Sequence, residues 1–65
     1  MQITLNGQVI NTEQTSVEGL LIEQGYENCV VATALDGQFI ATADRKETEL
    51  FDGCAIDIVA PMQGG

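Results

Sequence analysis

The residues with the clearest chemical potential are Gly64 and Gly65, which place a terminal carboxylate on a backbone without side chains. Glycine has no Cβ, so it passes through narrow clefts and adopts conformations closed to other residues. A carboxylate is a poor electrophile until it is converted to an acyl-adenylate, and an enzyme doing this must draw the tail toward ATP. Frayed chain ends are the other common setting for such residues. The sequence therefore predicts either a reacting carboxylate at Gly65 or a frayed end.

The rest of the chain offers little catalytic chemistry. It has no His and one Ser, and no glycine-rich loop followed by Lys, so it holds neither a triad nor a phosphate cradle. Cys29 has no basic neighbour in the sequence to activate it, and Cys29 and Cys54 alone do not complete a zinc site. We expect buried thiols, no metal site, no bound cofactor and no enzymatic activity of the chain's own.

Charge and hydropathy exclude several classes of partner. Ten acidic residues face only Arg45 and Lys46, for a net charge of −8. Nucleic acid and acidic membrane surfaces are therefore excluded, whereas a basic partner protein, or solubility alone, explains the charge. No apolar run reaches the ~20 residues of a membrane span. The first ten residues lack the basic and apolar regions of a signal peptide, so we expect a cytoplasmic protein.

The first half of the chain has the pattern of a hairpin followed by a helix. Residues 1–5 alternate between apolar and polar, Asn6–Gly7 suits a type I′ turn, and residues 8–11 form the return strand. Residues 15–25 then place apolar side chains at helical spacing. Thr15 with Glu18 fits a capping box, Ser16 is a competing N-cap, and Gly25 suits the helix end. Gly19 is unfavourable inside a helix; it marks either a close approach to the sheet or a simple imperfection.

The second half predicts three more strands. Residues 29–35 are apolar on both parities, as in a strand buried on both faces. Asp36–Gly37 turns the chain into a strand over 38–42. A polar, irregular segment follows, with a turn or bridge near Leu50 and Phe51. Residues 54–60 alternate again until Pro61 ends the last strand.

This order, β-β-α-β-β-β, predicts an α+β fold in which a mixed sheet of four to five strands packs on one helix. One helix covers only one face of such a sheet, so the other face stays partly open. The last strand can lie beside the first, at the centre of the sheet. This is the ubiquitin-like β-grasp arrangement. We expect a β-grasp domain over 1–60 and a flexible tail over 61–65.

Four segments carry a family resemblance along nearly the whole chain: SVEGLL, ALDGQFI, LFDG and the terminal GG. In this order they resemble the sulfur carrier proteins of thiazole (thiamine) biosynthesis, the ThiS family. The chain departs from the family pattern at Cys54, where many members carry an acidic residue, and at Gly19. Arg45 is at best a displaced counterpart of the family's arginine after the second hairpin.

The resemblance implies a chemical role for Gly65. An activating enzyme of the ThiF type, related to ubiquitin-activating enzymes, would adenylate its carboxylate with ATP and Mg²⁺. A sulfur donor, such as a persulfide made by a cysteine desulfurase, would then leave a thiocarboxylate. Thiazole synthase, of the ThiG type, would take the sulfur into the thiazole ring. Residues Pro61, Met62, Gln63 and Gly64 would serve tail recognition, and Phe51 is a candidate either for docking or for the core.

Three other functions remain open from the sequence. A sulfur carrier of molybdopterin synthesis shares the fold and the terminal glycines but is usually longer. A ubiquitin-like modifier would be conjugated to target lysines through Gly65. A plain protein-binding module would make no use of the glycines.

Overall fold

Two β-hairpins supply four of the five strands, and both turn on residue pairs with positive φ. In this computed structural model, which describes residues 1–61, Asn6 and Gly7 have φ values of 49° and 84°, and Asp36 and Gly37 have 48° and 84°. The strands are β1 (Gln2–Leu5), β2 (Gln8–Asn11), β3 (Ala32–Leu35), β4 (Gln38–Ile40) and β5 (Ala55–Val59). Asn and Asp tolerate the left-handed region better than other side chains, so both predicted turns are confirmed.

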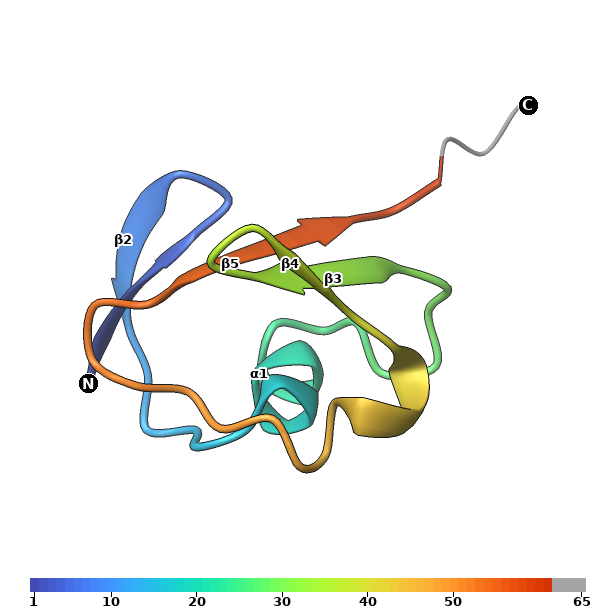
Figure 1. Cartoon of the computed structure of the whole chain (residues 1–65), viewed down its shortest axis with the longest axis horizontal. Helices are drawn as coiled ribbons and strands as arrows, with labels where there is room; N and C mark the ends of the chain where they lie inside the picture. The colour runs from blue at the N-terminus through green and yellow to red at the C-terminus, as the bar shows by residue number, and fades with distance from the viewer. Residues whose placement is uncertain (62–65) are drawn as a thin grey trace.

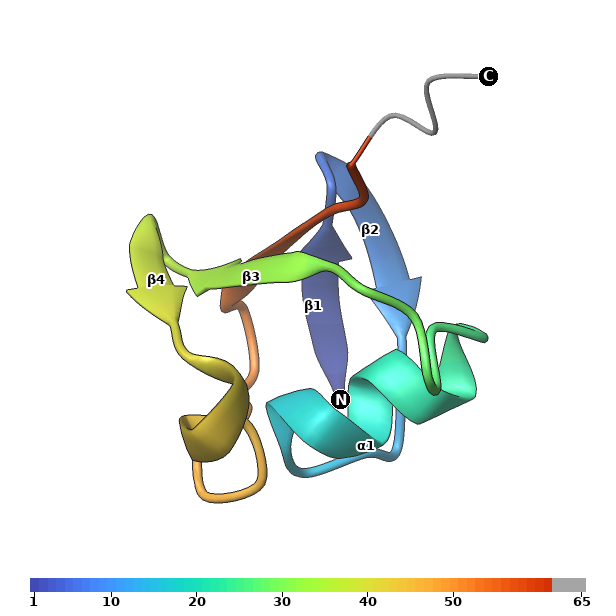
Figure 2. The ribbon, with the colours of Figure 1, turned by 90° about the vertical axis from the view of Figure 1, so that its right-hand side faces the viewer.

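The five strands form one mixed sheet with β5 at its centre. The strand order is β2-β1-β5-β3-β4, with β5 parallel to β1 and antiparallel to β3 (Figure 1). The single helix, α1 (Val17–Glu23), lies across one face of this sheet (Figure 2). The predicted α+β architecture and the central place of the last strand are both confirmed.

Side chains in the two hairpin turns extend the hydrogen bonding of β5. The β1–β5 ladder pairs only two residues on each strand. Beyond it, the Asn6 amide donates to the Ile56 carbonyl at 2.9 Å, and the Asn6 side-chain oxygen accepts from the Ile58 amide at 2.8 Å. On the other edge, the Asp36 carboxylate accepts from the Ala55 amide at 2.8 Å. Both turns therefore hold β5 in place.

The hydrophobic core lies between the sheet and the helix. Ile56 and Ile58 of β5 point into it beside Ile3 of β1, and Leu20 of α1 is fully buried against them. The other face of the sheet is open, with Val9 of β2 exposed at 65%. The predicted division into one covered and one open face is confirmed.

The helix begins at Ser16 and not at Thr15. The Ser16 hydroxyl accepts a hydrogen bond from the Gly19 amide at 3.0 Å, and its backbone is extended, as at an N-cap. The first two helical amides donate outside the helix, from Val17 to the Thr48 carbonyl and from Glu18 to the Arg45 carbonyl. The capping box on Thr15 is therefore wrong, because the Arg45 carbonyl, and not the Thr15 hydroxyl, accepts the hydrogen bond of the Glu18 amide.

The helix ends in a Schellman motif at Gly25, which has φ 86°. The Gly25 amide donates to the Ile22 carbonyl and the Tyr26 amide to the Leu21 carbonyl, at 3.1 and 2.8 Å. The half-buried Tyr26 then packs against the core. The predicted end of the helix is confirmed.

Three local predictions are wrong. The strand expected over 29–35 begins only at Ala32, and both Cys29 and Val30 are exposed, Val30 at 82%. Of the two thiols only Cys54 is buried.

Gly19 does not mark a close approach of the helix to the sheet. A Cβ there would lie 2.6 Å from the Gln14 side-chain oxygen, so Gly19 makes room for the segment that leads into the helix.

Among residues 1–61, Arg45 is the one charged residue that is buried, with 8% of its surface exposed. It follows a short 3₁₀ helix, η1 (Thr42–Asp44). Its Nε donates to the Thr33 hydroxyl at 3.2 Å and its Nη2 to the Val31 carbonyl at 2.6 Å. Because β3 begins one residue after Val31, this carbonyl lies outside the strand, and Arg45 satisfies it.

Within residues 1–61, no helix is both long and apolar enough to cross a membrane.

We predict that Ser16→Ala lowers the free energy of unfolding by about 1 kcal/mol, because the Gly19 amide loses its cap. Thr15→Ala is the matched control. The Thr15 side chain is exposed and makes no hydrogen bond within the described residues, so its loss should change stability by less than about 0.5 kcal/mol. Urea unfolding with both variants measures the difference, and equal losses would contradict Ser16 as the cap.

We also predict that Asn6→Gly loosens β5. Glycine fits the positive φ but removes the side-chain acceptor of the Ile58 amide, at a cost of about 1 kcal/mol. Amide hydrogen exchange should accelerate at Ile58. Asn6→Asp keeps an acceptor oxygen and should preserve the protection, so faster exchange at Ile58 in both variants would refute this role for the side chain.

Candidate functional site

The central strand leads directly into the predicted tail. β5 ends at Val59, and Pro61, the last described residue, lies exposed beyond the end of the sheet (Figure 1). The ladder on this end of β5 pairs Val59 with Ala32 of β3. The predictions for Met62, Gln63, Gly64 and Gly65 lie outside the described residues. A strand bonded on both edges is thus the structural base from which the tail segment begins.

Exposed apolar side chains gather where β5 ends. We call this group the tail-base patch, and its members are Val30, Ala32, Phe39, Val59 and Pro61. Val30 is 82% exposed, Phe39 72% and Val59 63%. Strand register explains the grouping, because Ala34 pairs with both Asp57 and Phe39, which puts Phe39 on the open face of the sheet. Large apolar side chains exposed together are typical of a protein contact.

The patch forms one wall of a shallow hollow of about 390 Å³. Val31, Thr42 and Arg45 also line it. The hollow therefore joins an apolar wall to a single cationic residue, next to the point where the tail begins.

Phe51 lies at the other end of β5. Its side chain is 50% exposed, so it is not a core residue, and it sits in the turn before the strand. The five strand residues between this turn and the tail span about 16 Å. The structure thus leaves Phe51 accessible to a partner but does not bring it to the tail base.

Charge is distributed unevenly over the two faces of the molecule. Among all residues in the five strands, Asp57 alone is charged, and it lies on the open face beside Ala34. The other acidic residues lie on the helix and in the loops. The strands therefore present an open face that carries a single charge, with an acidic surround.

Side chains in the described part of the chain do not assemble a metal centre. No group of three or more Cys, Asp or Glu residues within 1–61 is arranged to hold a metal ion. Cys54 is fully buried, and the exposed Cys29 lies in the loop after the helix. What this arrangement can do is present a segment of chain beside an apolar contact surface.

The exposure of three apolar side chains was not predicted from the sequence: Val30, Phe39 and Val59. Val59 and Phe39 could have been found from parity, since the inward Ile56 and Ile58 force Asp57 and Val59 outward. Val30 gave no such signal, because an apolar residue before a strand is normally read as part of it.

Comparison with known proteins agrees with this geometry. A crystal structure of a thiamine biosynthesis protein (ThiS) from Geobacter metallireducens matches with a TM-score of 0.80 at 24% sequence identity, over 100% of both chains. At this identity the match shows the shared fold. No protein with curated annotation matches the chain. The model of the ThiS family matches residues 2–65, nearly the whole sequence, and the chain therefore belongs to the ThiS family.

Proposed function

We propose that this protein is a sulfur carrier of thiamine biosynthesis whose working group is the α-carboxylate of Gly65. The observation that carries the proposal is the family match over residues 2–65, which includes both terminal glycines. The β-grasp body supports it, because the tail segment starts from the end of a strand held on both edges. In this proposal the β-grasp body is the part that partner enzymes recognise, and it is not itself an enzyme.

The proposed cycle has four steps. A ThiF-type enzyme uses ATP and Mg²⁺ to adenylate the Gly65 carboxylate, with pyrophosphate as the leaving group. The terminal sulfur of a donor persulfide, made by a cysteine desulfurase, attacks the acyl carbon and releases AMP. A thiol then attacks the sulfur of the donor cysteine, forms a disulfide with it and releases the thiocarboxylate. A ThiG-type thiazole synthase takes the sulfur into its substrate in exchange for an oxygen atom, which regenerates the carboxylate.

We propose that the activating enzyme contacts the tail-base patch while the tail enters its site. Pro61 belongs to the patch and also precedes Met62, Gln63 and Gly64, so docking and tail recognition are continuous. Asp57 on the open face offers one ion pair, and the net charge of −8 steers the protein toward a basic surface. Phe51, at the other end of β5, is the alternative candidate for the docking surface.

The proposal predicts a sulfur-bearing form of the protein. With a ThiF-type enzyme, ATP, Mg²⁺ and a persulfide source, intact mass spectrometry should show one oxygen exchanged for one sulfur, and fragmentation should place it at Gly65. Deleting Gly65 should abolish this species while the free energy of unfolding changes by less than about 0.5 kcal/mol. Absence of the species in the intact protein under these conditions would defeat the carrier proposal.

Two further measurements separate the alternative functions. Adducts on target lysines would indicate a ubiquitin-like modifier. Growth of a molybdopterin auxotroph, and not of a thiamine auxotroph, would assign the carrier to the other pathway.

Docking is tested by truncating the two exposed phenylalanines. Phe39→Ala should lower kcat/KM for adenylation about tenfold, as expected for a buried contact of a protein interface. Phe51→Ala is the matched control, since it removes the same side chain at the other end of β5 and should change kcat/KM less than about twofold. Both variants should keep the wild-type unfolding midpoint. A larger loss for Phe51→Ala would move the docking surface to the opposite end of the strand.

A further inference from the structure

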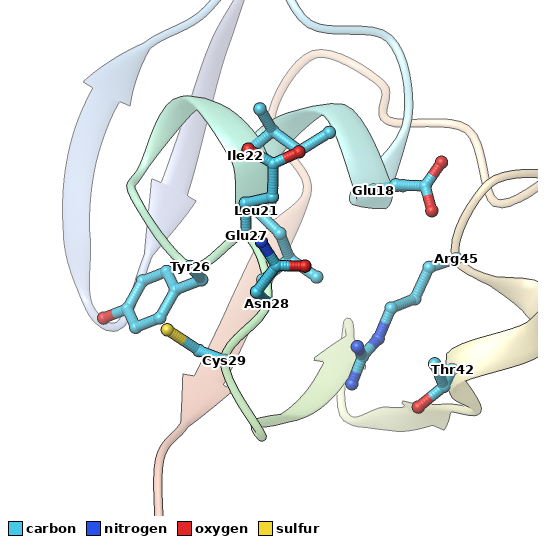
Figure 3. A pocket seen from close by; sticks show the side chains of 9 residues that line it. All are labelled: Glu18, Leu21, Ile22, Tyr26, Glu27, Asn28, Cys29, Thr42 and Arg45. Atoms are coloured by element: carbon cyan, nitrogen blue, oxygen red, sulfur yellow. The ribbon is translucent and has the colours of Figure 1, made fainter.

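A second concavity lies on the helix side of the molecule. It has a volume of about 340 Å³, in the range of small-molecule sites. Its walls come from α1, from the loop after α1 and from the segment around η1 (Figure 3). Leu21, Ile22 and Tyr26 give it an apolar side, and Arg45 and Thr42 face them from the other (Figure 3).

Arg45 brings a cation with unused hydrogen-bond donors to this concavity. A guanidinium has five N–H groups. Among residues 1–61, its hydrogen bonds go to Thr33 and Val31, and no carboxylate forms an ion pair with it. The Nη1 atom has no hydrogen-bond partner among these residues, and no side-chain nitrogen in this part of the chain is both fully buried and without a partner, so Nη1 reaches solvent. A buried charge of this kind gains most from a hydrogen-bonded anion.

Two carboxylates share the concavity without neutralising Arg45. Glu18 lies on the helix and Glu27 on the loop after it, and in Figure 3 the Glu18 carboxylate points away from the guanidinium. Neither carboxylate accepts a hydrogen bond from a residue within 1–61. Together with the net charge of −8, they oppose a multiply charged anion such as phosphate. They favour a ligand that also carries a positive group.

From these charges we propose that the concavity binds a small zwitterion of the amino-acid class. The ligand carboxylate pairs with the free N–H groups of Arg45, its ammonium faces Glu18 and Glu27, and its aliphatic part lies against Ile22 and Tyr26. Such a ligand has no net charge, so the acidic protein does not repel it. This site shares Thr42 and Arg45 with the hollow beside the tail-base patch but contains no member of the patch itself, and it does not depend on the sulfur-carrier proposal.

The test uses Tyr26 as a built-in reporter, because the chain has one Tyr and no Trp. Glycine, β-alanine and 4-aminobutyrate are titrated into the full chain while tyrosine fluorescence and the amide resonances of Asn28 and Cys29 are followed. Acetate and inorganic phosphate are the comparison ligands. We expect saturable binding of at least one amino acid with a Kd of about 1 mM, and weaker binding of acetate and phosphate. Failure of all three amino acids to saturate overturns the proposal.

A charge variant should change the affinities for amino acids and for acetate in opposite directions. Glu18→Gln should weaken amino-acid binding about two- to fivefold and strengthen acetate binding. Glu13→Gln, which makes the same charge change on an exposed residue outside the concavity, should alter neither. Arg45→Lys keeps the charge but loses the fork of donors, and should weaken amino-acid binding about tenfold where the variant remains folded. Equal effects of Glu13→Gln and Glu18→Gln, or stronger amino-acid binding in Glu18→Gln, would overturn the site.

Discussion

The central strand β5 must be bonded along both edges, and the other features of the molecule depend on this. β1 is too short to pair with all of β5, so the Asn6 side chain continues the ladder to the Ile58 amide. Asp36 closes the other edge at Ala55. Each turn residue therefore does two things: it adopts the positive φ that its hairpin requires, and it satisfies an amide of β5 that has no strand partner there.

A central last strand also determines how the two faces divide. A 65-residue chain buries only a small hydrophobic core, so Ile56 and Ile58 must both face the helix to fill it. Asp57 and Val59 therefore face outward. Antiparallel pairing carries this parity across β3 to Phe39 on the edge strand. The exposed apolar group at the tail base is thus a consequence of register, and the strand that buries the core also carries part of this exposed apolar surface.

The sequence predicted features set by local chemistry and failed where distant segments intervened. Asn6–Gly7, Asp36–Gly37 and Gly25 were recognisable because positive φ restricts the residue type. The N-cap was ambiguous because the amides of Val17 and Glu18 are satisfied by carbonyls about thirty residues away. Val30 was misplaced for a similar reason: its neighbour Val31 is anchored through its carbonyl by Arg45, from another loop, and not by a strand. The acceptor roles of Asn6 and Asp36 required the register of β5, which no local pattern contains.

The departures from the family pattern lie on the helix side of the sheet. Cys54 is fully buried and serves as a small core residue, Gly19 makes room for Gln14, and Arg45 supports the start of β3. None of the three replaces a member of the tail-base patch. In the proposed function the reacting group is a backbone carboxylate, so the body needs no side chain tuned for catalysis and is constrained only by folding and by the proposed docking. Changes in the covered core then need only preserve the fold, whereas changes on the open face would also alter the surface that we propose meets a partner.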